Sequence, residues 1–445
     1  MTTDNIEFDV PKFIDSRKLG WTQAGTIFLC ALIMFLDGLD TQAISYMAPH
    51  IAKEWGLSKA VLGPVFSSAL AGLMVGYLAI SPLSDKYGHR RIALISTVIF
   101  GLLTLATILA YDVNSLIALR FLTGIALGAV VPSAIALTTE YSPKRLRATF
   151  VLIIYSGFSL GFVAAGALAA NLIPEYGWRS LLWVGAIAPL ALALIIKFYL
   201  PESIDYLIRQ NADPKIAWGI LRKIEPSLGV DVPQRFVASE SEKRNAVTSL
   251  FKPGMITGTI LLWVTFLLNL GLFYALQSWM PTILTGLGYT LGTVALATSM
   301  TTVGGIVAAF VIGPAMDRIG PYASLAFVYI SGVLFALLLG YSIQASTSVL
   351  LTVCFFAGFC ISGGQKSVIA LAAIFYPTFL RSTGVGWALG IGRFGGIGGP
   401  LLVGALVQMG FKADQIFDMF AIPMLLSGAL VAWMGKLYGK GKISK

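Results

Sequence analysis

Two acidic residues lie close together inside an apolar stretch near the N-terminus. Asp37 and Asp40 are three residues apart, so on a helix they occupy one face about a turn apart. Each charge at that depth costs at least about 2.5 kcal/mol, and repulsion adds to the cost. The two carboxyl groups are therefore not expected to be ionised together, and at least one is expected to hold an exchangeable proton. A single helix-to-helix hydrogen bond or ion pair without transport is the alternative.

Arg120 lies in another apolar stretch, at a depth that matches the two acids. A guanidinium facing one carboxylate stabilises its anion, and protonation of that carboxylate frees the guanidinium for another anion. The sequence therefore predicts that Asp37, Asp40 and Arg120 couple proton binding to another event. A permanent structural bridge stays open as the alternative.

Three further polar residues interrupt apolar stretches nearer the C-terminus. Arg393 lies in a glycine-rich run, and a cation at mid-membrane depth needs an aqueous cavity or an anion. We interpret Arg393 as a candidate for binding a carboxylate, with backbone carbonyls or a neighbouring helix as the alternative partner. Lys366 can contact the same ligand or extend towards the membrane surface, and Gln365 can bond a phenol, a carboxylate or another helix.

The elements that must position these residues are transmembrane helices. The chain has 445 residues, of which 57% are hydrophobic and 12% charged, a composition that excludes a soluble fold. Twelve apolar stretches are each about 20 residues long, enough for a helix to cross the hydrocarbon core. They span residues 21–47, 61–82, 92–110, 115–139, 148–172, 180–199, 257–281, 290–315, 322–343, 347–372, 381–409 and 415–438.

The positive charges indicate the orientation. If the N-terminus is cytosolic, only four cations, Lys53, Lys59, Arg179 and Lys412, fall in outer loops. The positive-inside rule then places both termini in the cytosol, and the net charge of +10 reflects topology, with no nucleic-acid partner expected. We expect a tail (1–20), a six-helix bundle (21–199), a cytosolic loop (200–256), a second bundle (257–438) and a final tail (439–445).

The two halves of the chain resemble each other. The segment Ser81–Gly88 matches Gly313–Gly320 at an offset of 232 residues, and Pro49 and Pro281 keep the same offset. Two parallel six-helix repeats around a central pathway are therefore predicted. The offset relates Asp37 to the neutral Asn269, which indicates that the second half binds the ligand's polar groups through the residues Asn269, Tyr274, Gln277, Lys366 and Arg393.

Charged residues also mark the inner helix ends. We expect a gating network of inner latches formed by Asp85, Lys86, Arg90, Arg91, Glu140, Arg147, Asp317, Arg318 and Arg381. Setting the topology, or simple solvation, is the alternative role for these charges. The histidines, His50 and His89, lie in different loops, and no nucleophile and base occur together. No metal, cofactor or enzymatic activity is expected.

Several motifs resemble a known family. The segments Asp85–Arg91 (DKYGHRR) and Arg120–Gly128 (RFLTGIALG) are similar to signatures of the major facilitator superfamily. Within it, Leu36–Thr41 (LDGLDT), Glu140–Pro143 (EYSP), Phe375–Thr378 (FYPT) and Gly390–Gly395 (GIGRFG) resemble the aromatic acid/proton symporters.

The resemblance implies an all-α membrane protein with the major facilitator fold, a monomer of the inner (cytoplasmic) membrane. It would import a small aromatic carboxylate with protons by alternating access. Hydroxylated benzoates such as 4-hydroxybenzoate or protocatechuate are the implied substrates. An exporter or antiporter of another organic anion and a receptor that does not translocate its ligand are the alternatives.

Overall fold

The chain forms twelve long apolar helices in the computed structural model, which describes residues 7–229, 232–233, 235–237, 247–377 and 380–439. The spanning helices are α2 (Trp21–Glu54), η1 with α3 (Lys59–Val61 and Leu62–Ala79), α5 (His89–Thr107), α6 (Val113–Glu140), η2 with α7 (Lys144–Leu146 and Arg147–Tyr176), α8 (Arg179–Tyr199), α11 (Ile256–Gly286), α12 (Leu291–Ile319), α13 (Pro321–Ser342), α14 (Thr347–Phe375), α15 (Arg381–Gln408) and α16 with α17 (Ala413–Met419 and Ala421–Tyr438). The predicted number of spans and the all-α membrane class are confirmed.

The helices extend further than the apolar stretches in several places. Helix α2 ends at Glu54 and contains Pro49, whereas the apolar stretch ends near residue 47. A proline costs a helix one backbone hydrogen bond, which neighbouring groups in a packed bundle can replace. The segment that follows α3, expected as part of a loop, forms the short helix α4 (Ser81–Tyr87).

The described helices group into two compact units. Unit 1 contains residues 1–40, 71–161 and 182–242, and unit 2 contains residues 41–70, 162–181 and 243–445. Because their boundaries fall inside α2, α3 and α7, parts of the first half of the chain pack within unit 2.

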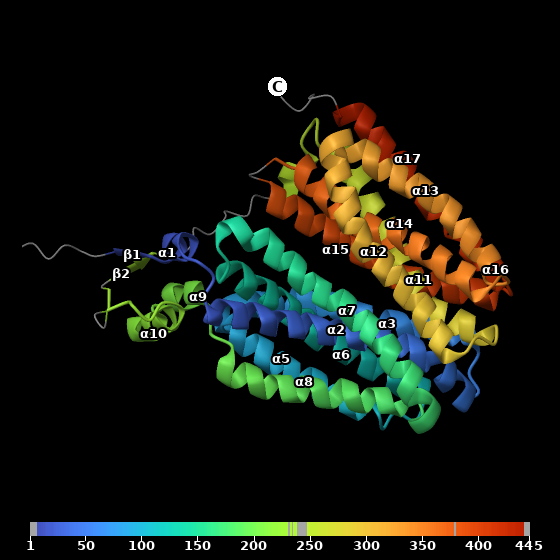
Figure 1. Cartoon of the computed structure of the whole chain (residues 1–445), viewed down its shortest axis with the longest axis horizontal. Coiled ribbons are helices and arrows are strands. Elements are labelled where there is room, and N and C mark those ends of the chain that lie inside the picture. The colour runs from blue at the N-terminus through green and yellow to red at the C-terminus, as the bar shows by residue number, and fades with distance from the viewer. Residues whose placement is uncertain (1–6, 230–231, 234, 238–246, 378–379, 440–445) are drawn as a thin grey trace, which may run out of the picture. The chain divides into compact units, whose positions relative to one another are not determined.

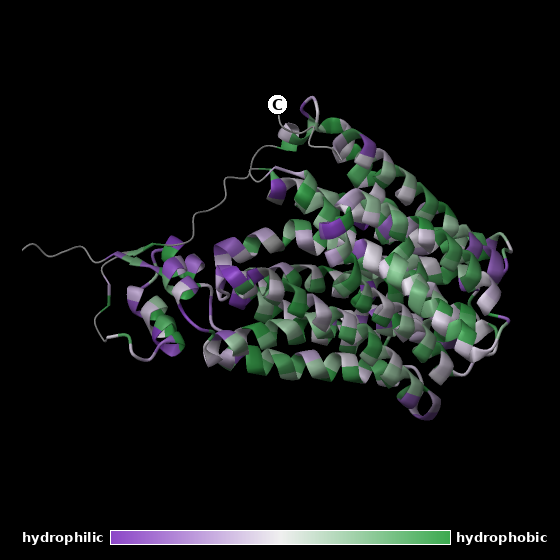
Figure 2. Ribbon diagram, turned by 45° about the horizontal axis from the view of Figure 1, so that its top comes forward, coloured by the Kyte–Doolittle hydropathy of each residue, from purple (hydrophilic) through white to green (hydrophobic). Residues whose placement is uncertain are grey.

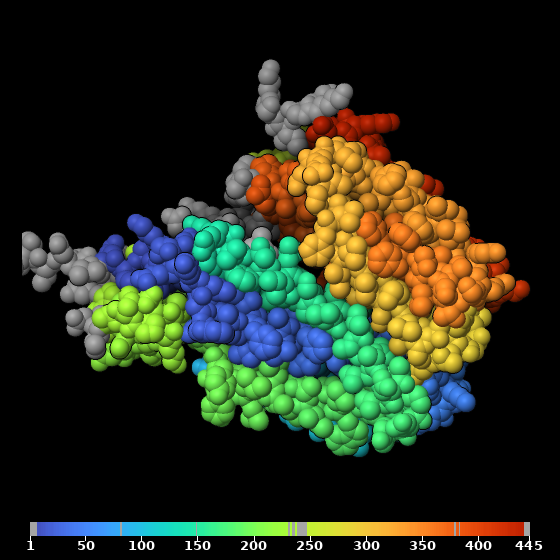
Figure 3. Space-filling model, viewed as in Figure 1, coloured from blue at the N-terminus to red at the C-terminus, as the bar shows by residue number. Residues whose placement is uncertain are grey.

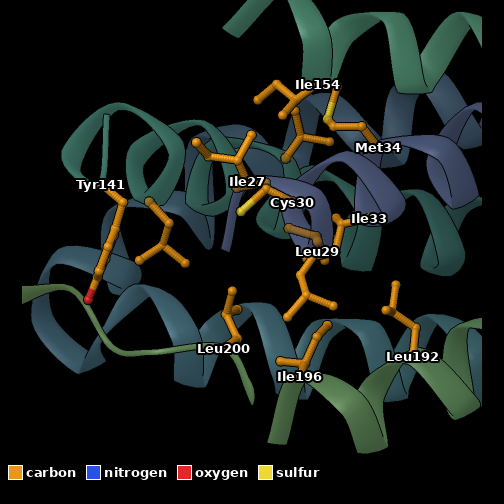
Figure 4. Packing of buried hydrophobic residues seen from close by; sticks show 14 of the residues in the cluster. Ile27, Leu29, Cys30, Ile33, Met34, Tyr141, Ile154, Leu192, Ile196 and Leu200 are labelled. Atoms are coloured by element: carbon orange, nitrogen blue, oxygen red, sulfur yellow. The ribbon is translucent and has the colours of Figure 1, made fainter. Parts of the chain in front are cut away.

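The core of unit 1 is built from aliphatic side chains of α2, α7 and α8. Met34 of α2 lies beside Ile154 of α7, Leu29 of α2 points towards Ile196 of α8, and all four are buried (Figure 4). Tyr141, which follows α6, closes the same core and accepts a hydrogen bond from the Gln23 side chain at its carbonyl, 2.9 Å away.

The N-terminal segment folds together with part of the segment between the halves. Strand β1 (Glu7–Asp9) pairs in parallel with β2 (Arg235–Val237), and α1 (Val10–Ser16) lies beside α9 (Ile204–Arg209) and α10 (Pro214–Ile224) (Figures 1 and 3). Phe8, Trp218 and Phe236 form its aromatic centre, with ring centroids of neighbouring pairs 5.2 to 6.2 Å apart.

We call residues 7–16, 204–224 and 235–237 the N-terminal cluster. Hydrophilic residues gather in it and at the helix ends, whereas the long helices are mostly hydrophobic (Figure 2). An ion pair between Arg17 and Glu225 joins the segments flanking the cluster. The segments expected as a separate tail and loop thus pack as one small structure; the wider domain division stays a prediction.

In unit 2, α11 packs along α15 and α12 along α14. Gly395 and Gly399 of α15 lie so close to α11 that a Cβ atom on either would overlap the backbone of Leu267 or Gly271. Small residues at such crossings let helices pack backbone to backbone. This close approach holds the polar residues of α11 and α15 near one another.

One end of unit 2 carries the turns between several helices. Residues 54–60 lie there with the C-terminal ends of α11 and α15, since Lys59 lies against Gly286 and the carbonyl of Ala60 lies near Gly404. We call this region, together with residues 343–344 and 407–416, the distal end. It joins parts of both sequence halves inside one compact unit.

Candidate functional site

Arg120 and Asp40 form a fully buried ion pair in unit 1. The Nη1 atom of Arg120 donates to Oδ1 of Asp40 at 2.9 Å, and its Nη2 atom donates to Oδ2 at 2.6 Å. The exposed fraction is 0% for Arg120 and 2% for Asp40. This two-pronged geometry is the strongest that a guanidinium and a carboxylate can form. The structure therefore brings together two of the three residues expected to act with protons.

Asp37 lies one turn before Asp40 on the same helix, with an exposed fraction of 3%. Gly38, between the two acids, faces α7 so closely that a Cβ atom would overlap the carbonyl oxygen of Phe158. From the other side, Gly161 of α7 approaches the backbone of Phe35 and Leu39 in the same way. Backbone contact at these glycines fixes the stretch of α2 that carries both acids.

The pair can act as a proton-dependent switch. Protonation of Asp40 removes the negative charge that balances Arg120, and the Nε atom of Arg120 already has no hydrogen-bond partner among the described residues. Removing one partner from a buried pair leaves an uncompensated charge, at a cost of about 3 to 5 kcal/mol. A proton on Asp40 would therefore leave the buried guanidinium of Arg120 without its balancing anion. The same geometry also suits a permanent bridge.

A second group of polar residues lies within unit 2. Arg393 of α15 donates from Nη1 to the hydroxyl of Tyr274 on α11 at 3.2 Å. Tyr274 is buried and packs with Leu70 and Leu270, while Arg393 keeps part of its surface exposed. A partly exposed cation beside a buried phenol is suited to a carboxylate attached to an aromatic ring.

Two amides extend this polar group along α11. Asn269 donates from Nδ2 to the carbonyl of Ile361 at 3.4 Å, and Gln277 donates from Nε2 to the hydroxyls of Thr301 and Thr302 at 3.1 and 3.3 Å. Both amides are buried. Asn269, Tyr274 and Gln277 thus lie on α11, and Arg393 lies on the neighbouring helix α15.

Several oxygen atoms here have no hydrogen-bond partner in the described part of the chain. They are Oδ1 of Asn269, Oε1 of Gln277, Oε1 of Gln365 and Oγ of Ser362. An unsatisfied buried polar group costs about 1 to 3 kcal/mol of free energy. A ligand that donates hydrogen bonds to these oxygens removes that penalty, which favours its binding. Phenolic hydroxyls are donors of this kind.

Lys366 has a backbone partner. Its ammonium group donates to the carbonyl of Gly305 on α12 at 3.2 Å. This contact favours a role in helix packing over either ligand contact or extension towards the membrane surface. Substrate contact by Lys366 stays a prediction.

Ser362, Thr301 and Thr302 were not among the residues selected from the sequence. Their hydroxyls are common in membrane helices, where they usually bond to their own backbone. The relevance of Thr301 and Thr302 appears only from their hydrogen bonds with Gln277, and that of Ser362 from its unpartnered hydroxyl; no sequence pattern marks either.

The expected latch residues divide into two groups. Two of them, Glu140 and Arg90, contact the beginning of the segment after α8, and a third lines a cavity beside it. Glu140 accepts backbone hydrogen bonds from Ile204 and Asp205, the backbone of Arg90 donates to Glu202 at 2.9 Å, and the Arg90 side chain donates to the carbonyl of Lys197. Arg147 lines a cavity of about 310 Å³ with Glu140.

Glu202 is a contact residue missed at the sequence level. Its carboxylate lies where a Cβ atom of Gly88 would be, and it also accepts from the backbone of Ser203 at 2.9 Å. A glutamate directly after a proline at the end of α8 was the available signal.

The other latch residues are exposed at helix ends. The Nε2 atom of His89 lies 3.6 Å from Oδ1 of Asp85, and Lys86 lies over the ring of Tyr87. Within the described ranges, no ion pair is found for Arg91, Asp317, Arg318 or Arg381, which lie exposed. Their latch role therefore stays a prediction. No group of three potential metal ligands occurs among the described residues.

The sequence matches the family model of the Major Facilitator Superfamily over residues 30–400. The chain belongs to the Major Facilitator Superfamily. The match covers both candidate groups of residues and eleven of the twelve spans. Transport by a multi-pass membrane protein is therefore the activity class of this chain.

Curated members of the superfamily resemble it over nearly their whole length. The chain is 39% identical to the 4-hydroxybenzoate transporter PcaK of Pseudomonas aeruginosa, with 96% of both chains covered. It is 37% identical to the gallate transporter of Pseudomonas putida, with 93% of this chain and 92% of the relative covered.

A solved structure in the superfamily has the same fold. It is a bacterial homologue of the human lysosomal transporter Spinster, in an inward-facing and unoccupied conformation. The TM-score is 0.63 at 18% identity, with 94% of this chain and 98% of that chain covered. This likeness confirms the predicted major facilitator fold.

Proposed function

We propose that this protein imports a small aromatic carboxylate of the hydroxybenzoate class together with protons, by alternating access. The relatives named for 4-hydroxybenzoate and gallate support the substrate class. The observation that carries the proposal is the buried pair of Arg120 and Asp40 with a second buried acid, Asp37, one turn away.

The three residues supply the coupling. With Asp40 ionised, Arg120 is neutralised and this part of the bundle is stable. Asp37 is the second buried acid, one turn from Asp40, and in this proposal it carries the exchangeable proton. A proton that moves to Asp40 releases Arg120, and the released cation biases the bundle towards another arrangement. Each half of the transport cycle would thus carry a different protonation state.

The polar residues of unit 2 supply the substrate contacts. Arg393 would pair with the carboxylate, and Tyr274 would hold the guanidinium in place. The unpartnered oxygens of Asn269 and Gln277 would accept hydrogen bonds from phenolic hydroxyls. A ring without hydroxyls would leave those oxygens unsatisfied, so hydroxylated acids should bind more tightly than benzoate.

The distribution of lysine and arginine supports an orientation with both termini in the cytosol and a location in the cytoplasmic membrane. In that orientation the distal end of unit 2 faces outward, and the N-terminal cluster lies in the cytosol. The transporter would act as a monomer.

Uptake by proteoliposomes tests the coupling. Purified protein should accumulate labelled 4-hydroxybenzoate against its gradient when the outside is acidified, and the accumulation should vanish when the pH difference is collapsed. Asp37→Asn should equilibrate the acid without concentrating it, because binding survives while the exchangeable proton is lost. Asp112→Asn is the matched control. Its carboxylate only caps α6, and hydrogen bonds from Ser115 hold its pKa below the ordinary value.

The same assay separates the alternatives. Efflux of preloaded acid driven by an acid exterior would indicate an exporter or antiporter, and saturable binding without flux would indicate a receptor. Undiminished concentrative uptake by Asp37→Asn would contradict the proposed role of this residue.

A further inference from the structure

A separate cavity opens at the distal end of unit 2. Its volume is about 370 Å³, at the small end of the roughly 300 to 1,000 Å³ that ligand pockets occupy. The walls are mostly apolar, with side chains from α11, the end of α13, and the turn between α15 and α16. Its main apolar lining residues are Trp279, Ile283, Leu287, Ile343, Phe411 and Ile416. Such walls suit a flat hydrophobic ring.

Two lysines line this apolar cavity. They are Lys59, from the turn before α3, and Lys412, from the turn before α16. Within the described residues, neither forms an ion pair, while Asp414 adds one negative charge to the lining. The cavity therefore has a surplus of positive charge next to its apolar walls.

The surplus is notable because cations are rare in the loops expected outside. Only four occur there, and one of them, Arg179, is paired with Glu54 at 2.8 Å. Of the other three, Lys59 and Lys412 line the same cavity. Lys59 also lies against Gly286, the last residue of α11, where a cation favours the helix end. That contact accounts for Lys59 but leaves the ammonium group of Lys412 unexplained.

A buried hydroxyl adds a polar contact. Thr282 lines the cavity with an exposed fraction of 1%, and its Oγ1 atom has no hydrogen-bond partner in the described part of the chain. A hydroxyl in this state is available to a ligand that carries a hydroxyl or carboxylate group.

Trp279 of α11 forms a buried part of the cavity wall. Its indole Nε1 donates to the carbonyl of Pro400 at 3.0 Å, and its ring meets Phe66 of α3 edge to face at 5.4 Å. Gln277 lies two residues further along α11. We call this cavity the chamber, and the buried Trp279 is part of its wall.

We propose that this chamber is a first binding site for aromatic carboxylates, where the anion is held before Trp279 moves. The carboxylate binds between Lys59 and Lys412, the ring lies against the apolar walls, and Thr282 contacts a polar substituent. This inference rests on the proposed function for its substrate class and its orientation.

Uptake kinetics test the chamber. The double variant Lys59→Gln with Lys412→Gln should raise KM for 4-hydroxybenzoate about three- to tenfold with kcat unchanged, since two exposed charge contacts are lost. The double replacement by arginine should keep the wild-type KM. Lys53→Gln, an exposed cation of the same region that does not line the cavity, is the control. Added salt should raise the wild-type KM towards that of the glutamine variant.

A labelling measurement gives a readout that does not depend on transport. In Lys412→Cys, a membrane-impermeant thiol reagent should react, and benzoate should slow the reaction while acetate does not. An unchanged KM in the double glutamine variant, or equal protection by benzoate and acetate, would overturn the inference. If the wild type transports no aromatic acid, the proposed function fails, and protection by benzoate still decides whether the chamber binds one.

Discussion

The charge balance around Arg120 decides what a proton can do in unit 1. The guanidinium is completely buried and donates two hydrogen bonds to the carboxylate of Asp40. Desolvation of an unpaired guanidinium is costly, so a neutral Asp40 and an unchanged bundle cannot both be stable. Protonation chemistry and helix arrangement are linked here by the cost of one buried charge.

Asp40→Asn tests this link at the level of one residue. The amide keeps the size of the side chain but leaves Arg120 with its charge uncompensated, so the folded state should lose about 3 to 5 kcal/mol. We expect a clearly lower melting temperature in detergent and no concentrative uptake. Asp112→Asn should melt close to the wild type, because asparagine caps a helix about as well as aspartate. A wild-type melting temperature in Asp40→Asn would show that the pair does not hold the bundle.

The sequence predicts that an acid of α2 pairs with Arg120, because the residues lie at the same membrane depth, but it does not predict which acid does so. Asp37, Asp40 and Arg120 share a depth that can be read from the ends of their apolar stretches. Which acid meets the guanidinium depends on the rotation of α2 and α6 about their axes. Helices that are apolar on all sides carry little periodic signal of this rotation.

At the scale of helices, the crossing of α2 and α7 depends on Gly38. Gly38→Ala would bring a methyl group into the carbonyl oxygen of Phe158, so the helices must separate. We expect a lower melting temperature and impaired uptake, because the same stretch of α2 carries both acids. Gly25→Ala is the matched control on α2, where nothing lies within 4 Å of the new methyl group.

The control should behave in the opposite direction. Alanine is favoured over glycine inside a helix by roughly 0.5 to 1 kcal/mol, so Gly25→Ala should melt at or above the wild-type temperature. Equal behaviour of the two variants would mean that the close approach at Gly38 contributes nothing to stability.

The N-terminal cluster provides a second test at this scale. Trp218 is 6% exposed and packs against Phe8 and Phe236. Trp218→Ala removes the centre of this small structure. Truncation of a buried aromatic residue lowers the free energy of unfolding by about 3 to 5 kcal/mol. We expect faster hydrogen exchange in residues 7–16, with the spanning helices unaffected.

Trp21→Ala is the comparison for this variant. Trp21 begins α2 and is 94% exposed, so its removal should leave the exchange of residues 7–16 unchanged. Protection that persists in Trp218→Ala would show that β1 and α1 are held by other contacts.

The cluster also shows where sequence reasoning stops. The twelve spans follow from length and hydrophobicity, which act locally along the chain. The pairing of β1 with β2 joins three residues to three others 228 positions away, Glu7 with Arg235 for example. Strands this short carry no alternating pattern, so they could not be predicted among polar segments. The same holds for Glu202, whose importance comes from its contacts with Gly88 and Arg90.

At the scale of the whole molecule, contacts inside unit 2 join the two sequence halves. The Gln42 side chain donates to the carbonyl of Gln277 at 3.1 Å, and Ser67 donates to the carbonyl of Ile397 at 2.7 Å. Both contacts lie inside unit 2, and both connect a helix of the first half to a helix of the second. We expect alternating access between these helices to require that both contacts break. Their strength therefore sets part of the balance between the closed and open forms.

Ser67→Ala measures that balance. The lost hydrogen bond contributes about 0.5 to 1.5 kcal/mol, so the open fraction of the distal end should rise roughly two- to tenfold. Ser68→Ala is the control in the next position, because Ser68 donates to Val65 within its own helix. Residues 53 and 408 are both exposed, so spin labels on Lys53→Cys and Gln408→Cys can report the distance across the distal end by pulsed electron paramagnetic resonance. Ser67 bonds to α15, whereas Ser68 bonds within its own helix. If the population with the long distance grows only in Ser67→Ala, the lost contact between the halves is the cause. If it grows in both variants, the cause is a change in α3 itself, and the contact does not set the balance.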